Sequence, residues 1–146
     1  MNSIAVVTAA VLAASPALAA DPPTPTSGAG PILSATTSVW GQPISPPPGP
    51  LQVTASILEI PAGATLPVHK HPYPRFGYVL SGRLRVTDLE TGKVIVLETG
   101  QFAIDPVDQW HSGQALDGRP VRLLLIDQTP PGASNTVLRD PAAAAK

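Results

Sequence analysis

From residue 51 onward the chain alternates apolar and polar residues in short runs, and glycine-centred turns separate these runs. In Arg75–Leu80 (RFGYVL), for example, Phe76, Tyr78 and Leu80 fall on one face, because successive side chains of a strand point to opposite sides. Apart from an alanine-rich tail, no stretch of this region has a helical period of apolar residues. Short strands that recur about every ten residues predict an all-β domain, built as an antiparallel sandwich or barrel.

Eight or nine segments have this strand pattern, and the last of them is weak. They are residues 51–60, 65–71, 75–80, 83–89, 93–98, 101–105, 110–115, 121–128 and 135–139. A region of this length can form one modest hydrophobic core but not two. The sequence therefore predicts a single barrel domain over 51–140, followed by a tail at 141–146.

The amino terminus has the composition of an export signal. Residues 4–14 are uninterrupted apolar or small residues, and Ala17-Leu18-Ala19 follows as a small-x-small sequence. Such a run has the length of a signal-peptide core and is too short to span a bilayer. We therefore expect a signal peptide over 1–19, cleaved after Ala19 or Ala20, and a periplasmic or secreted protein. No Lys or Arg precedes the run, which is atypical, and a short buried helix is the alternative.

Residues 20–50 hold nine of the nineteen prolines of the chain. Because proline removes a backbone donor and fixes φ, this composition predicts an extended tether. Residues 32–40 are more apolar, and one edge strand there is the alternative that the sequence leaves undecided.

Charge and cysteine content exclude several classes of function. The net charge is −1, and the nine basic residues are scattered from Lys70 onward, which favours neither nucleic acid nor an anionic membrane surface as a partner. The chain has no cysteine, so it has no disulfide, no thiolate metal site and no thiol nucleophile. No later segment is long and apolar enough to span a membrane. A small molecule is therefore the expected partner.

The chain has three histidines, and two of them form His69-Lys70-His71. In a strand, residues i and i+2 point to the same face about 7 Å apart, so their imidazoles can share one ion through bonds of about 2 Å. His111 lies on another predicted strand. Three neutral imidazoles with open coordination positions are typical of a reactive centre for one divalent transition metal ion: Fe, Mn, Ni, Cu or Zn. A surface or hydrogen-bonded pair is the alternative reading of an isolated H-x-H.

Two blocks around these histidines resemble the two sequence motifs of cupins, G-x5-H-x-H-x(3,4)-E-x6-G and G-x5-P-x-G-x2-H-x3-N. The matching positions are Gly63, His69, His71, Gly82, Gly100, Pro106 and His111. The resemblance covers residues 51–128. It implies a cupin-type double-stranded β-helix (jelly-roll) barrel in which His69, His71 and His111 bind a metal, and it makes a homodimer an expectation.

Three positions depart from the cupin motifs. Arg75 stands where the first motif has its glutamate, and a count one residue longer reaches Phe76. Asp108 replaces the glycine of the second motif and Ala115 replaces its terminal asparagine. The chain therefore resembles the three-histidine cupins that lack this glutamate, a group that contains some dioxygenases.

Three further side chains are candidates for the site. An Arg75 that faces inward would favour an anionic substrate, whereas an outward one is a surface cation, and nearby prolines leave its direction open. Asp105 and Gln109 could each hydrogen-bond a ligand imidazole or contact substrate. Alternation favours Gln109, which shares the face of His111, while Asp105 is the only nearby carboxylate; a solvated loop is the alternative for both.

These observations predict an exported cupin whose three-histidine metal centre acts on or binds a small, anionic or enolisable molecule. As an enzyme it would be a metal-dependent oxygenase, such as a dioxygenase, or a lyase or isomerase. The alternatives are a non-catalytic binding protein of the same fold and a barrel that binds no metal, because one fold hosts many functions.

Overall fold

The computed structural model describes residues 30–140. The expected signal peptide at 1–19, the first part of the tether and the tail at 141–146 lie outside the described residues. Within them the chain forms no helix, so the structure contains no helix that could span a membrane. Its strands are β1 (Gln52–Ile60), β2 (His69–Lys70), β3 (Arg75–Ser81), β4 (Arg83–Asp88), β5 (Val94–Glu98), β6 (Phe102–Asp105), β7 (His111–Ala115), β8 (Val121–Thr129) and β9 (Val137–Leu138).

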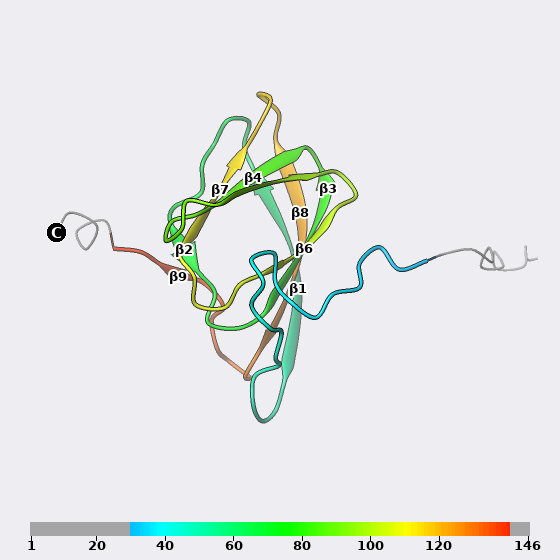
Figure 1. The fold of residues 1–146 in the computed structure, drawn as a ribbon, viewed down its shortest axis with the longest axis vertical. Coiled ribbons are helices and arrows are strands. Elements are labelled where there is room, and N and C mark those ends of the chain that lie inside the picture. Colours follow the sequence, from blue (N-terminus) through cyan, green and yellow to red (C-terminus); the bar gives the residue numbers. More distant parts are fainter. Residues whose placement is uncertain (1–29, 141–146) are drawn as a thin grey trace, which may run out of the picture. The chain divides into compact units, whose positions relative to one another are not determined.

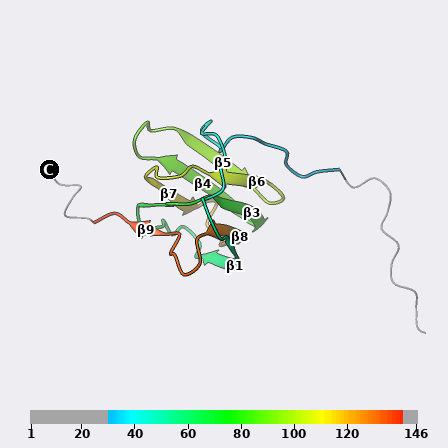
Figure 2. The same ribbon diagram turned by 90° about the horizontal axis from the view of Figure 1, so that it is seen from below.

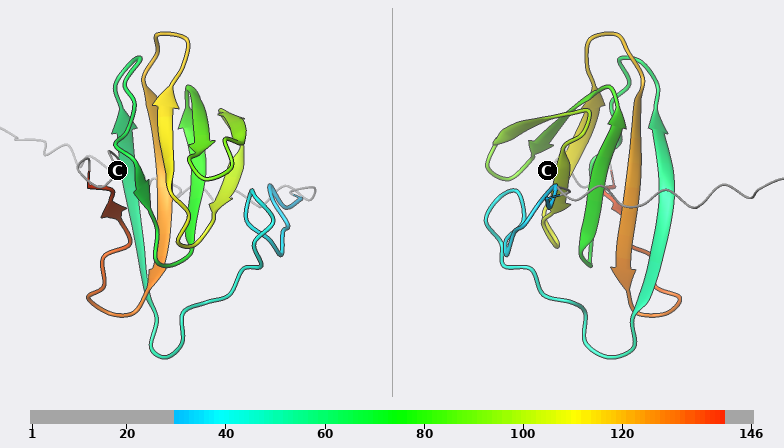
Figure 3. Two further views of the ribbon diagram at one scale, coloured as in Figure 1. Left: turned by 60° about the vertical axis from the view of Figure 1, so that its left-hand side comes forward. Right: turned by 90° about the vertical axis from the view of Figure 1, so that its right-hand side faces the viewer.

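The strands of the described residues form two antiparallel sheets (Figure 1). One has the order β1-β8-β3-β6 and the other the order β5-β4-β7-β2-β9. Figure 2 shows the two sheets from one end, and Figure 3 shows β1, β8 and β3 running side by side. The longest pairing joins β1 and β8 along their whole length, from Gln52 opposite Thr129 to Ile60 opposite Val121. The predicted all-β jelly roll is confirmed.

The hydrophobic core lies between the two sheets. On β3 the buried face is not the apolar one that the sequence pattern marked, because Val79 lies in the core and Leu80 is exposed. On β8 every second residue is buried, which places Val121, Leu123 and Leu125 in the core. The other sheet contributes Leu84, Val86 and Ala115, and the four-stranded sheet adds Ile60 and Val79. Residues on the core face of β3 and β8 therefore point toward the same interior space.

The turn from β3 to β4 requires the last glycine of the first motif. Gly82 has a φ of 85°, which side chains with a Cβ rarely adopt, and a Cβ there would lie 2.5 Å from the main-chain oxygen of Pro120. Conformation and lack of space therefore both require glycine at this position.

Residues 32–40, for which the sequence left an edge strand open, form no strand in the structure. Thr37 makes an isolated bridge with Pro43, and the N–H of Val39 donates to the main-chain oxygen of Ile104 on the edge strand β6. The prolines on either side limit further pairing because they have no N–H to donate. Next in the chain, Trp40 packs against the core.

Candidate metal centre

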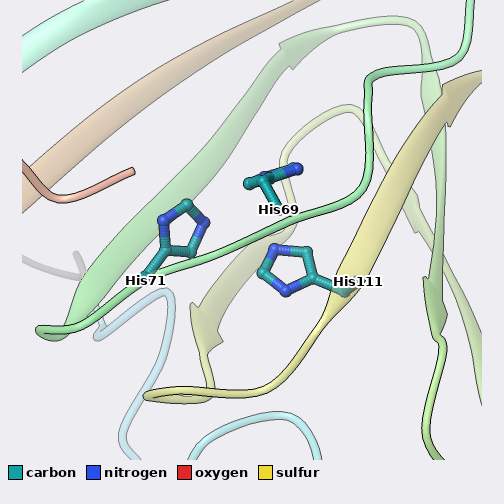
Figure 4. A group of neighbouring side chains, drawn as sticks. All are labelled: His69, His71 and His111. Carbon is teal, nitrogen blue, oxygen red and sulfur yellow. The ribbon is translucent and has the colours of Figure 1, made fainter. Parts of the chain in front are cut away.

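The three histidines meet inside the fold, between the two sheets (Figure 4). His69 on β2 lies directly opposite His111 on β7, and His71 follows just after β2. One ring nitrogen of each residue lies within 4.8 Å of the other two, and the ring centroids are 4.5, 4.9 and 5.0 Å apart. All three side chains are buried. The structure thus brings together the three residues that the sequence selected.

Each imidazole is oriented by a main-chain carbonyl. The Nδ1 of His69 lies 2.8 Å from the oxygen of Pro67, that of His71 lies 2.6 Å from the oxygen of Asn135, and that of His111 lies 2.9 Å from the oxygen of Gln109. A carbonyl can only accept, so Nδ1 carries the proton in each ring. The Nε2 atoms are left with their electron pairs free, which is how metal-binding histidines are held in proteins.

Burial keeps these rings neutral. It lowers the pKa of His69 and of His111, and it lowers the pKa of His71 to about 3, where the neighbouring Arg75 guanidinium adds to the effect. Only neutral imidazole can bind a metal. At neutral pH all three rings are therefore in the form that ligation requires.

Arg75 faces the interior, which the sequence left open. It lines the same cavity as the three histidines. Its Nε and Nη2 donate to the two carboxylate oxygens of Asp127 at 2.7 and 2.8 Å, and Nη2 also donates to the Oγ1 of Thr136 at 3.3 Å. The charge of this inward arginine is therefore balanced by a carboxylate that the sequence analysis did not identify.

Asp127 and Asn135 connect Arg75 to the histidines. Burial alone would raise the pKa of Asp127, but hydrogen bonds from Arg75 and Asn135 outweigh it and hold this pKa below its usual range. The Nδ2 of Asn135 donates to Asp127 at 2.6 Å, while the main-chain oxygen of Asn135 accepts from His71. A continuous set of hydrogen bonds thus joins Arg75, Asp127, Asn135 and His71. The sequence gives one sign of this hydrogen-bond network: Asp127 falls on the face of its strand that alternation directs toward the core.

Asp105 lies on β6, directly opposite Arg75 on β3. Its Oδ2 is 3.5 Å from the Nε2 of His71. Burial raises the pKa of Asp105 to about 6. Asp105, which the sequence suggested only as a nearby carboxylate, therefore forms part of the wall of the cavity beside the histidines.

Gln109 contacts His111 through its main-chain carbonyl and not through the side chain that the sequence analysis considered. Alternation does not extend to Gln109, because the strand begins only at His111 and Asp108 has a φ of 59°. Its side-chain Oε1 is buried and accepts no hydrogen bond from residues 30–140. Lys70 points away from the histidines, and its Nζ lies 2.8 Å from a carboxylate oxygen of Asp108.

A cavity of about 50 Å³ adjoins the three rings. Its polar wall is formed by the histidines with Arg75 and Asp105, and leucines from both sheets form most of the remainder. A larger hollow of about 310 Å³ shares His69 and Arg75 with it and is lined mainly by apolar residues, among them Leu58 and Leu138. A molecule bound at the histidines would therefore contact one cation, one carboxylate and apolar walls.

Comparison with known proteins gives a consistent picture of this domain. Residues 56–127 match a family model described as a cupin domain. No curated protein is similar enough in sequence to count as a relative. Among solved structures, the DMSP lyase DddQ from Ruegeria pomeroyi DSS-3 is 25% identical with a TM-score of 0.53, over 61% of this chain and 44% of that one.

Two further structures are similar in fold. The oxalate decarboxylase of Lactobacillus farciminis is 19% identical with a TM-score of 0.54, over 64% of this chain and 28% of that one. The polyketide cyclase RemF from Streptomyces resistomycificus is 18% identical with a TM-score of 0.52, over 61% of this chain and 63% of that one. The chain spans less than two thirds of each of these proteins.

Proposed function

Because the chain belongs to the cupin superfamily, with its cupin domain over residues 56–127, we propose that it is a metal-binding protein. His69, His71 and His111 hold one divalent transition metal ion. The observation that carries this proposal is the set of three buried, neutral rings, each with Nδ1 bound to a carbonyl and Nε2 free. Ring nitrogens within 4.8 Å of one another are close enough for bonds of about 2 Å to reach a common centre after small side-chain rotations.

A small anionic or enolisable molecule is the proposed ligand. Arg75 supports an anion, because its guanidinium lines both the cavity and the adjoining hollow. Within residues 30–140 its Nη1 donates no hydrogen bond, whereas Nε and Nη2 are engaged with Asp127 and Thr136. An anion at Nη1 would gain a charge-assisted hydrogen bond, and the apolar walls would exclude water around it.

The bound metal would supply Lewis-acid chemistry or, if redox-active, electron transfer. Arg75 would orient the anion, and Asp105 is the carboxylate in the wall of the same cavity. An oxygenase, including a dioxygenase, fits such a site. A lyase also fits, and the 25% identical structure is a lyase by its name. The alternative is a non-catalytic protein that binds a metal or small ligand in the same barrel.

Metal titration tests the metal site. The purified, metal-free protein should bind Fe(II), Mn(II), Ni(II), Cu(II) or Zn(II) with a stoichiometry close to one, and His71→Ala and His111→Ala should abolish this binding. Lys70→Ala is the matched control, because Lys70 lies between two of the ligands and points outward. A wild-type protein that binds none of these ions would exclude the proposal.

Turnover separates the enzyme from the binding protein. The metal-loaded protein is incubated with a panel of small keto acids, diketones and thiols while oxygen consumption and product formation are measured. Conversion that is lost in His71→Ala supports an enzyme. Saturable binding of a carboxylate without conversion supports the non-catalytic alternative.

We also propose that the protein is exported, on the basis of residues 1–19. Amino-terminal sequencing of the protein from the periplasmic or secreted fraction should start at Ala20 or Asp21. An intact Met1 in protein recovered from the cytoplasm would contradict export.

A further inference from the structure

The cupin motif places a glutamate where this chain has Arg75, on β3. The neighbouring strand β6 supplies a different carboxylate. Asp105 is the direct cross-strand partner of Arg75, and the side chains of directly opposite residues leave a sheet on the same face, with Cβ atoms about 4.5–5.5 Å apart. Asp105 therefore points into the region that a side chain at position 75 also reaches.

Asp105 lies beside the nitrogen of His71 that is free for a metal. The Nδ1 of His71 is bound to the carbonyl of Asn135, so Nε2 is the donor, and the Oδ2 of Asp105 is 3.5 Å from this Nε2. Two ligand atoms on one tetrahedral ion, with bonds of about 2.1 Å, lie about 3.4 Å apart. The separation between Asp105 and His71 is thus that of two neighbouring ligands. Among the described residues the group of ligand atoms within 4.8 Å of one another holds the three histidines without Asp105, so the Asp105 side chain would rotate toward the ion on binding.

Among the described residues the Asp105 carboxylate accepts no hydrogen bond, and Arg75 acts on it only through its charge. Within the part of the chain that the structure describes, its nearest charged or titratable partner is His71. Arg75 faces Asp105 in the sheet but is bound bidentately to Asp127. A largely buried carboxylate that accepts no hydrogen bond is costly unless a cation balances it.

We infer that Asp105 is a ligand of the metal and supplies, from the strand next to Arg75, the carboxylate that the first motif lacks. The centre is then formed by three histidines and one aspartate. This inference rests on the proposed metal site. It assigns the two acidic residues beside Arg75 to different tasks: Asp127 balances the arginine, and Asp105 balances the ion.

The absence of cysteine from the chain makes a direct spectroscopic test available. Asp105→Cys places the only thiol of the protein at the inferred ligand position. A thiolate bound to Co(II) gives an intense near-ultraviolet charge-transfer band, so Co(II) added to this variant should produce a band that the wild type lacks. Glu98→Cys is the control, because Glu98 is exposed on β5, and it should give no such band.

Affinity supplies the second measurement. Asp105→Asn keeps the shape of the side chain but removes its charge, and it should weaken Co(II) binding by about ten- to a hundred-fold while the stoichiometry stays at one. Glu98→Gln makes the same charge change away from the site and should bind Co(II) as the wild type does. Circular dichroism verifies that each variant is folded.

The outcomes distinguish this inference from the proposed function. If Co(II) binds to Asp105→Asn with an affinity within two-fold of the wild type, or binds to Asp105→Cys without a new band, Asp105 is not a ligand. The three-histidine site then stands, provided that His71→Ala still abolishes binding. If the wild type itself binds no Co(II) or other transition metal, the proposed function fails and the inference fails with it.

Discussion

Acid should destabilise the metal-free protein, and His71 should account for much of the effect. The pKa of this residue is about 3 in the folded state, where burial disfavours the charged ring, and about 6.5 in an unfolded chain. Below pH 6.5 the unfolded chain therefore binds a proton at position 71 that the folded protein does not. The stability contributed by the neutral ring is complete above pH 6.5 and is lost as the pH falls.

The magnitude follows from the two pKa values. One pH unit corresponds to about 1.4 kcal/mol for each such group. Between pH 7.5 and pH 5, His71 alone should lower the free energy of unfolding by about 2 kcal/mol, and by about 4 kcal/mol when the pH reaches 3. The pKa values of His69 and His111 are also lowered by burial, so these residues act in the same direction.

Asp105 acts in the opposite direction. Burial raises its pKa to about 6 from the ordinary value of 3.8, so the folded protein takes up a proton before the unfolded chain does. Its contribution is complete below pH 3.8 and is lost as the pH rises through 6. Between pH 7.5 and pH 5, Asp105 should therefore raise the free energy of unfolding by about 1.4 kcal/mol, which offsets part of the loss caused by the histidines.

Urea denaturation in the presence of a chelator, at pH 7.5 and at pH 5, measures how the free energy of unfolding changes with pH. His71→Asn retains an amide N–H for the carbonyl of Asn135 but does not titrate, and its loss of stability between the two pH values should be about 2 kcal/mol smaller than that of the wild type. Asp105→Asn should lose about 1.4 kcal/mol more than the wild type. A His71→Asn variant with the pH dependence of the wild type would refute the reasoning.

Three further predictions concern other parts of the domain. Asp127→Asn leaves the inward Arg75 without its bidentate partner and should lower the free energy of unfolding by about 2–4 kcal/mol in urea denaturation; a loss below about 1 kcal/mol would contradict this. Gly82→Ala introduces a Cβ 2.5 Å from a main-chain oxygen, so it should lower the melting temperature clearly more than Gly92→Ala does. Gly92 has a similar φ but open space around it, so equal effects of the two substitutions would mean that only φ matters. Arg75→Ala should retain metal but weaken the binding of oxalate to the metal-loaded protein by about 1.5–3 kcal/mol in calorimetry, whereas the exposed Arg85→Ala should not; unchanged affinity would remove Arg75 from the ligand site.

The alternation of residues predicted the strands well because it depends only on which side chains are buried. The second strand is the exception. A strand was expected over 65–71, but only His69–Lys70 forms one, since Pro67 and Pro72 flank this pair and cannot donate to a ladder. Even so, the spacing of the two motifs identified the histidines that converge.

The polar partners of the metal site could not be predicted from the sequence pattern. Periodicity assigns residues to faces, but it does not give the register between strands. The pairing of Arg75 with Asp105 and Asp127 follows from the registers of β3 with β6 and β8. The role of Asn135 depends on a carbonyl that contacts a ring 64 residues away in the chain, and no local signal marks such a contact.

The central claim is that three imidazoles from two motifs share one transition metal ion. The most direct test is elemental analysis of the wild-type protein and of His71→Ala, both isolated from the compartment in which the protein functions. The wild type should contain close to one equivalent of a single transition metal, and the variant should contain almost none. A wild-type protein that stays free of transition metals, although cells and buffers supply them, would contradict the account.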